Sequence, residues 1–336
     1  MSDLPKSGVY LSPAPHLSVY PTARHVMAIV VLTLLPIAGY GVYLFGLPAL
    51  VTILVSVASA VACEALFRLA TRQDVRVGDL SAVITGLLLA LVLPPATPPA
   101  MTALGAAFGI VVAKEFFGGL GANVFNPALS GRAFLLASFA TPLTTWSVPR
   151  MLAAPDAVSA ATTLSYLKPA EGGVHSAFEV ASLAGYSSRG ELYWKMFLGE
   201  RAGCVGESAI FLIVLAFAFL ALARVIDWRA PVAMVLTAVA VCWAAGIDPA
   251  LTVLSGGLLF GAVFMATDYA TSPVTPMGRL LFGAGAGLIT ALVRVFGGFP
   301  EGVMFSILIM NSVVPFLDRA IPRKYGYARA RKGATK

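Results

Sequence analysis

The sequence predicts an all-α, polytopic membrane protein with about ten transmembrane helices in two inverted five-helix repeats. Its 336 residues are 58% hydrophobic and 12% charged, whereas soluble domains average roughly 45–50% and about 25%. Two long stretches, 25–63 and 80–113, carry no charge, and a helix crosses a bilayer with about 20 apolar residues. Similar glycine patterns recur in the two halves of the chain. So much apolar surface requires lipid as part of the solvent.

The first repeat, residues 24–141, is predicted to hold five spans. Turn signals at Gly46-Leu47-Pro48 and at the proline cluster 94–99 divide its two long apolar runs, because proline cannot continue a helix. The expected spans are 24–45 and 48–70, a pair within 80–113, and 126–141.

The second repeat, residues 207–318, is predicted to hold five more segments that are nearly free of charge. They are 207–225, 229–245, 248–266, 279–296 and 302–316. Between the repeats lies a polar stretch, 142–206, which we expect to form an external loop. The proline-rich tail 1–23 and the basic tail 319–336 complete the chain.

The orientation follows from the Lys and Arg residues of the short loops, which are in excess on the cytoplasmic side. They lie on one predicted side: Arg68, Arg72, Arg76, Lys114, Arg224, Arg229, Arg279 and the basic tail. We therefore expect a multi-pass protein of the bacterial inner (plasma) membrane with both termini in the cytoplasm and the loop 142–206 on the periplasmic side. The basic tail is interpreted as a topology anchor beside membrane lipid, with no nucleic-acid partner.

The glycine pattern supports two inverted repeats. Gly105-Ala-Ala-Phe-Gly109, followed by Phe117-Gly-Gly, matches Gly283-Ala-Gly-Ala-Gly287, followed by Phe296-Gly-Gly. An odd number of spans in each half places the halves in opposite orientations, as in many transporters. The matched glycines indicate either interrupted helices around a central site or close helix packing, and both interpretations stay open.

The cysteines and histidines limit the possible redox chemistry. Cys63, Cys204 and Cys242 form no CxxC pair, so this chain alone provides neither a four-cysteine iron–sulfur cluster nor a c-type haem site. The three histidines lack the helical pairing of a membrane haem site. No metal ligand set is predicted.

The predicted external loop contains Asp156-Ala-Val-Ser159-Ala160-Ala161-Thr162. This segment resembles the flavinylation motif D-x-x-S/T-G-A-T of the RnfD/NqrB family. The resemblance implies that Thr162 carries FMN through a phosphoester bond and that Asp156, Ser159 and Ala161 complete the motif. Ala160 departs from the usual glycine. Taken alone, a pattern this short also fits a helix cap at Ser159 and a surface threonine.

A second segment carries the same resemblance. The run from Lys114-Glu115 through Gly118-Gly119, Asn123 and Asn126-Pro127 to Arg132 is similar to the family's glycine-rich segment, and the likeness covers nearly the whole chain. The short N-terminal tail is more like the RnfD branch of the family. The resemblance also implies a second, noncovalent flavin, riboflavin, among the spans, with this segment as a candidate wall.

Individual side chains in this segment carry two interpretations each. Arg132 either holds a flavin phosphate or ring oxygen, or pairs with Glu115, since a charge in an apolar segment is normally paired. Asn123 and Asn126 either hydrogen-bond a flavin edge or, for Asn126 before Pro127, form a turn. Arg294 is expected to extend to the outer membrane surface.

Three carboxylates lie in or beside predicted spans. Glu64 falls within a span, and Asp248 and Asp268 bracket another. Oxygen ligands of this kind bind translocated cations, whereas carboxylates at helix ends usually act as solvated caps.

The resemblance implies a membrane subunit of an ion-translocating oxidoreductase that is not catalytically complete alone. Electrons moving between reduced ferredoxin and NAD would pass through the FMN on Thr162 and drive Na⁺ or H⁺ movement. Implied partners are the A, B, C, E and G subunits of the Rnf complex, and a flavin transferase for maturation. An alternative from another class is a flavin-free secondary transporter or channel on the same repeat, which would purify colourless.

Overall fold

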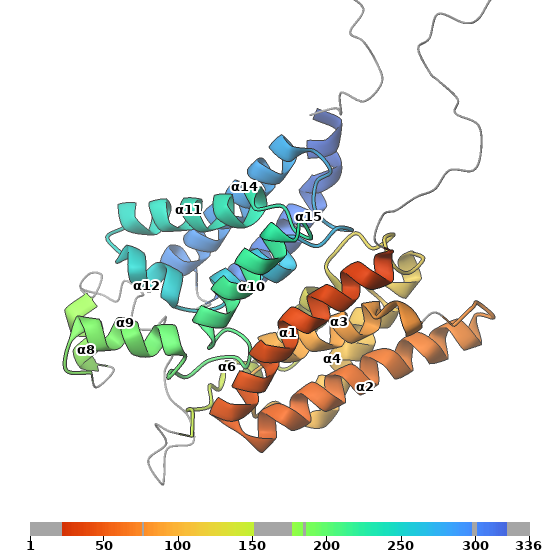
Figure 1. The fold of residues 1–336 in the computed structure, drawn as a ribbon, viewed down its shortest axis with the longest axis horizontal. Helices are drawn as coiled ribbons and strands as arrows, with labels where there is room; N and C mark the ends of the chain where they lie inside the picture. The colour runs from red at the N-terminus through yellow and green to blue at the C-terminus, as the bar shows by residue number, and fades with distance from the viewer. Residues whose placement is uncertain (1–21, 76, 151–176, 184–185, 298–300, 321–336) are drawn as a thin grey trace, which may run out of the picture.

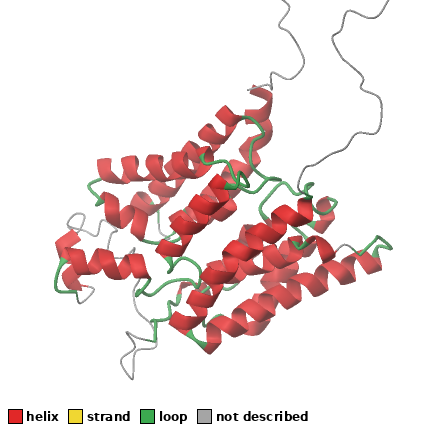
Figure 2. Cartoon of the chain, in the orientation of Figure 1, coloured by secondary structure: helices red, strands yellow, loops and turns green. Residues whose placement is uncertain are grey.

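All regular secondary structure in the described part of the chain is helical (Figure 2). The computed structural model describes residues 22–75, 77–150, 177–183, 186–297 and 301–320. Among these described residues, five stretches are long and apolar enough to cross a bilayer: Ala23–Phe45, Leu47–Ala70, Pro99–Phe117, Pro276–Phe296 and Val303–Ala320. The predicted all-α membrane fold is confirmed. The count of about ten spans and the inversion of the repeats stay predictions.

The first half consists of five main helices. They are α1 (Ala23–Phe45), α2 (Leu47–Ala70), α3 (Ser81–Val92), α4 (Pro99–Val111) and α5 (Pro127–Ser138), with 3-10 turns η1 (Val77–Asp79) and η2 (Glu115–Phe117). Gly46 separates α1 from α2 with φ of +75°, a conformation that glycine adopts at little cost. The proline cluster separates α3 from α4. Both sequence-based divisions are therefore confirmed.

The expected span 126–141 is shorter than predicted. Helix α5 has 12 residues and ends at Ser138, and a separate short helix, α6 (Ala140–Thr144), follows. At 1.5 Å per residue, 12 residues cover about 18 Å, whereas the hydrocarbon core is about 30 Å thick. Helix α3 also has 12 residues. The first half thus combines the long helices α1 and α2 with three shorter ones, α3, α4 and α5, of 12 or 13 residues.

The second half consists of α10 (Ile210–Leu222), α11 (Arg229–Ala244), a broken segment, α14 (Pro276–Phe296) and α15 (Val303–Ala320). Two shorter helices, α8 (Ala177–Leu183) and α9 (Arg189–Leu198), precede it. The broken segment consists of α12 (Pro249–Leu254), α13 (Leu258–Phe260) and the π-helical turn η3 (Gly261–Met265). The expected continuous span 248–266 is therefore wrong. Its chain leaves the helix at Ser255-Gly256-Gly257, where Gly256 has φ of +64°.

Each half packs in a similar way (Figure 1). Helix α2 lies against α3 and α4, and α4 against α5, while α11 lies against α14, and α14 against α15. A Cβ atom on Gly109 would stand 2.6 Å from the Pro127 carbonyl oxygen, and one on Gly287 would stand 2.3 Å from that of Met234. These matched glycines therefore serve close helix packing, the second of the two open interpretations.

The two halves meet along α1 and α10, which lie side by side in Figure 1, and along α5 and α15. The Tyr40 ring on α1 meets the Phe211 ring on α10 edge-on, with centroids 5.2 Å apart. One hydrophobic core continues through both halves, from Ile37 on α1 to Phe282 on α14. Large apolar side chains remain exposed on the outer helix faces, as contact with lipid requires.

Candidate functional site

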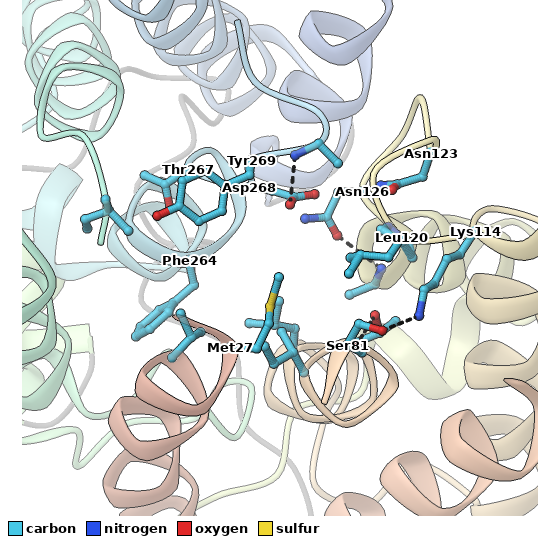
Figure 3. Close-up of a pocket in the computed structure, with 18 of the residues that line it drawn as sticks. Met27, Ser81, Lys114, Leu120, Asn123, Asn126, Phe264, Thr267, Asp268 and Tyr269 are labelled. Carbon is cyan, nitrogen blue, oxygen red and sulfur yellow. Dashed lines mark hydrogen bonds between the residues drawn. The ribbon is translucent and has the colours of Figure 1, made fainter. Parts of the chain in front are cut away.

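A cavity opens between the two halves and is called the interhalf cavity here (Figure 3). Its walls come from α1, α3, the segment between α4 and α5, α10, η3 and residues 267–270. It contains about 810 Å³ of space free of atoms, including the open part at its mouth. Ligand pockets combine mostly apolar walls with a few polar groups. The walls of this cavity have that character, since apolar side chains surround two asparagines, Ser81, Lys114 and Asp268.

Asn123 and Asn126 lie together in this cavity (Figure 3). The Asn126 side-chain oxygen accepts hydrogen bonds from the N–H groups of Ala128 and Leu129, so it caps the start of α5. The Asn123 amide donates to the Phe125 carbonyl oxygen at 3.2 Å. These bonds use the Asn126 amide oxygen and the Asn123 amide nitrogen. The Asn126 nitrogen and the Asn123 oxygen can therefore serve a ligand.

The opposite wall of the cavity comes from the second half. Asp268 accepts hydrogen bonds from the Ala270 N–H and the Thr271 hydroxyl, and the Tyr269 hydroxyl donates to the Val225 carbonyl oxygen. Phe264 on η3 provides an aromatic surface (Figure 3). The Asp268 carboxylate is thus held by backbone and hydroxyl donors at the cavity edge.

A buried ionic cluster lies beside the cavity, where α2 meets the end of α4. The Lys114 ammonium is 2.8 Å from a Glu64 carboxylate oxygen, and Arg68 Nε is 3.2 Å from a Glu115 carboxylate oxygen. Arg68 also lies 3.4 Å from Glu64. All four side chains are at least nine-tenths buried, and their formal charges sum to zero. Glu64 is therefore paired with two cations inside the protein.

Arg132 does not pair with Glu115, so that sequence-based alternative is wrong. Arg132 Nη2 lies 2.6 Å from Glu301 Oε2, which joins α5 of the first half to the start of α15 in the second. Glu115 faces Arg68 instead, because the chain turns through Gly118, Gly119 and Gly121 with positive φ angles before α5 begins. Arg132 also lines a smaller cavity with Trp146 and Met304, separate from the interhalf cavity.

Around Arg132, one thiol and two carboxylates come together. The Cys204 sulfur and one carboxylate oxygen each from Glu207 and Glu301 lie within 4.8 Å of one another. This donor set matches a metal site in type, but Arg132 Nη2 stands 2.6 Å from Glu301 and 3.7 Å from the sulfur. Since the Arg132 guanidinium already pairs with Glu301 and contacts the Cys204 sulfur, the geometry favours an ion-paired cluster over a metal site. Sequence reasoning missed Arg201, Glu207 and Glu301.

Arg294 is buried, so its expected extension to the outer surface is wrong. Its guanidinium donates to the carbonyl oxygens of Thr252 and Ser255 at 2.8 and 3.0 Å. Arg201 donates to the Leu254 carbonyl oxygen on the same turn. These carbonyls lose their helical partners where α12 ends. The two arginines therefore complete the hydrogen bonding of the broken segment.

Asp248 acts as a helix cap, as one of its two interpretations proposed. Its carboxylate accepts from the N–H groups of Ala250 and Leu251 at the start of α12, and it also faces Arg189 at 3.2 Å. The motif residues Asp156, Ser159, Ala161 and Thr162 lie outside the described residues. Of the site residues predicted from the sequence, Asn123 and Asn126 therefore share a cavity and Arg132 lies elsewhere.

Comparison with known proteins adds independent information. The sequence pattern of the NQR2, RnfD, RnfE family matches residues 10–326. The chain is 40% identical to the D subunit of the proton-translocating ferredoxin:NAD(+) oxidoreductase complex of Clostridium ljungdahlii, over 95% of this chain and 96% of the relative. It is 36% identical to the Na(+)-translocating counterpart of Acetobacterium woodii, over 96% and 97%. It is 40% identical to the D subunit of the ion-translocating oxidoreductase complex of Stutzerimonas stutzeri, over 90% and 91%.

Proposed function

The chain belongs to the NQR2, RnfD, RnfE family, and from this we propose that it is the RnfD component of an Rnf-type ion-translocating ferredoxin:NAD oxidoreductase complex. The observation that carries the proposal is similarity to D subunits of such complexes along almost the full length of both chains. Two of these relatives are named for different ions, protons and Na⁺. The proposed activity is therefore electron transfer coupled to movement of one of these two ions, and it requires the A, B, C, E and G subunits as partners.

We further propose that FMN is attached to Thr162 through a phosphoester bond. The support is the motif that Asp156, Ser159 and Ala161 complete around this threonine. A threonine hydroxyl is a weak nucleophile at neutral pH, so the attachment requires a flavin transferase. When bound, the flavin would supply the electron-carrying group that the cysteines and histidines of this chain do not provide.

The interhalf cavity is the proposed site of a noncovalent riboflavin. The edge of a flavin ring presents both hydrogen-bond donors and acceptors, and the cavity offers the Asn126 amide nitrogen and the Asn123 amide oxygen. Met27 and Phe264 provide apolar surface for the faces of the ring. These residues would bind and orient the flavin, and the surrounding helices would limit its contact with water.

The flavin-free transporter remains the second candidate because the segment between α12 and α13 is interrupted, as helices are at many transporter sites. However, Arg201 and Arg294 already bind the carbonyl groups at this interruption. A cation there would compete with two guanidinium groups. The interruption therefore supports the transporter only weakly. Visible absorbance of the purified full chain separates the two candidates, because the flavoprotein would be yellow and the flavin-free transporter colourless.

We also propose that the basic loops face the cytoplasm and that the loop 142–206 faces the periplasm of the bacterial inner membrane. The test replaces Gln73 with cysteine on the proposed cytoplasmic side and Ser182 with cysteine on the proposed outer side. A membrane-impermeant thiol reagent should label Ser182→Cys in intact cells and Gln73→Cys only after lysis. The reverse labelling pattern would overturn the orientation.

The proposed activity is tested in inverted membrane vesicles that contain the whole complex. Reduced ferredoxin should drive NAD reduction and uptake of Na⁺ or H⁺, and Thr162→Ala should abolish both while the complex still assembles. The matched control is the neighbouring Thr163→Ala, which should keep both activities. Wild-type rates in Thr162→Ala would contradict a role for this threonine, and loss of neither activity on deletion of the whole chain would contradict the assignment.

A further inference from the structure

A second cavity lies next to the interhalf cavity and is called the basic-end cavity here. It is lined by Arg68, Arg72, Gln73, Asp74, Asp79, Gly118 and Leu120. Asp74, Arg72 and Gln73 are exposed, so this cavity communicates with the surroundings of the protein. Leu120 lines both cavities. The two cavities therefore share a wall at this residue, and the residues around it form the layer between them.

A short chain of hydrogen bonds crosses that layer. Asp79 lines the basic-end cavity, and its carboxylate oxygen accepts a hydrogen bond of 2.6 Å from the Ser81 hydroxyl. The Ser81 hydroxyl accepts a hydrogen bond of 2.6 Å from the Lys114 ammonium. Both Ser81 and Lys114 line the interhalf cavity (Figure 3). Three side chains thus connect the open cavity to the proposed flavin cavity.

Lys114, the cationic member of this hydrogen-bond chain, belongs to a cluster of buried charges. Lys114 is 2% exposed and also lies 2.8 Å from Glu64 on α2, while Arg68 on α2 faces Glu64 and Glu115. The two cations and two anions of this cluster cancel. Asp79 is additionally held by the Ser81 N–H at 2.8 Å. Lys114 and Glu64 alone would form a stable ion pair. The Ser81 hydroxyl and the Asp79 carboxylate are not needed for that pair, and they extend the hydrogen-bond network toward the basic-end cavity.

We propose that Asp79, Ser81 and Lys114 form a proton route from the basic-end cavity to the flavin in the interhalf cavity. The proposal rests on the riboflavin site proposed above. When bound, a flavin that accepted two electrons would also need protons, and the interior of a membrane protein supplies these only through side chains or ordered water. Of the three side chains, the Lys114 ammonium is the proton donor at the wall of the interhalf cavity.

The transfers balance without another reactant. The electrons would come from the redox partners, and the proton delivered to a bound flavin would leave the Lys114 ammonium. The Asp79 carboxylate then takes a proton from water in the basic-end cavity. The Ser81 hydroxyl turns toward the lysine, gives its proton to the Lys114 amine, takes the new proton from Asp79 and turns back, so Asp79 is again a carboxylate. One proton has then moved from solvent to flavin, and all three side chains have returned to their starting states.

The test uses the full chain in the Thr162→Ala background, which removes the covalent flavin and leaves that of the interhalf cavity. Dithionite reduces the protein in a stopped-flow instrument, and the loss of flavin absorbance is followed in H₂O and D₂O. Asp79→Asn keeps the hydrogen-bond acceptor but cannot carry a proton, and Ser81→Ala interrupts the chain. Ser81→Thr restores a hydroxyl. Ser56→Ala is the control, because Ser56 is a buried serine between α2 and α3 outside the cavity.

We expect Asp79→Asn and Ser81→Ala to retain flavin but to slow its reduction by at least about 10-fold, with a changed solvent isotope effect. Ser81→Thr and Ser56→Ala should reduce at close to the wild-type rate. Wild-type rates in Asp79→Asn and Ser81→Ala would overturn the route alone, as would equal slowing in Ser56→Ala. If the Thr162→Ala protein without any further substitution also contained no flavin, the riboflavin site and the route would both be overturned.

Discussion

The pair of Arg132 and Glu301 links the two halves of the chain, so its removal should weaken the whole fold. The guanidinium lies 2.6 Å from the carboxylate, and each side chain is 11% exposed. Glu301 also accepts a hydrogen bond from the Gly257 N–H at 2.7 Å. Arg132→Gln leaves Glu301 next to the Glu207 carboxylate without its directly paired cation, although Arg201 and Arg294 stay nearby. Glu301→Gln leaves a buried guanidinium without its main partner.

The expected magnitude follows from burial. Removal of one partner from a buried ion pair costs about 3–5 kcal/mol, because the other charge stays desolvated and unpaired. Slight exposure of both side chains places this pair at the lower end, about 3 kcal/mol for each single variant. The double variant with two glutamines removes both charges, so it should cost about as much as one single variant. The coupling energy is then also about 3 kcal/mol.

The assay is thermal unfolding of the purified full chain in detergent for the wild type, both single variants and the double variant. Each single variant should unfold several degrees below the wild type, and the double variant close to either single variant. The pair Arg189 and Asp248 is the control, since the Arg189 side chain is 55% exposed and its coupling should be much smaller. Additive effects at Arg132 and Glu301 would refute the direct pairing.

Two further predictions concern helix packing and pH. Gly287→Ala should destabilise the chain by about 1–2 kcal/mol, because a Cβ atom would stand 2.3 Å from the Met234 carbonyl oxygen, whereas Gly39→Ala on α1, with nothing within 4 Å, should be neutral or stabilising in the same melting assay. Burial alone would raise the pKa of Asp227, but hydrogen bonds from the Arg229 N–H and from Arg279, together with the charges of both arginines, hold it below its usual value. The stabilisation by Asp227 is therefore present above its unfolded pKa of about 3.9 and is lost as the pH falls through the lower folded value, so the melting difference between wild type and Asp227→Asn should disappear in acid and persist at neutral pH. A difference that grows in acid would contradict this sign.

Local signals in the sequence predicted the features that depend on local structure. Gly46 and the proline cluster divide helices because of their own backbone restrictions, and these divisions appear where expected. Asn126 and Asp248 each precede a proline and cap the helix that follows, which is also a local property. Asn123 and Asn126 lie close together in the sequence, and in the structure they line one cavity.

Long-range features were not predictable in this way. Arg132 and Glu301 are 169 residues apart, and nothing in either neighbourhood identifies the other as its partner. In the sequence, Arg294 is a charge near a helix end, and its burial becomes clear only once the interruption at residues 255–257 supplies free carbonyl groups. The apolar run around that interruption matched a continuous span in composition. Its Ser255-Gly256-Gly257 sequence was the signal that marks the break.

The most direct test of the proposed flavoprotein is in-gel fluorescence of the denatured full chain after expression with a flavin transferase. The account predicts a fluorescent band in the wild type and in Thr163→Ala, and no band in Thr162→Ala. Because denaturation removes noncovalent flavin, the band reports covalent attachment alone. A band that persists in Thr162→Ala would move the attachment to another residue. The absence of a band from the wild type, with a working transferase control, would contradict the covalent flavin and favour the flavin-free transporter.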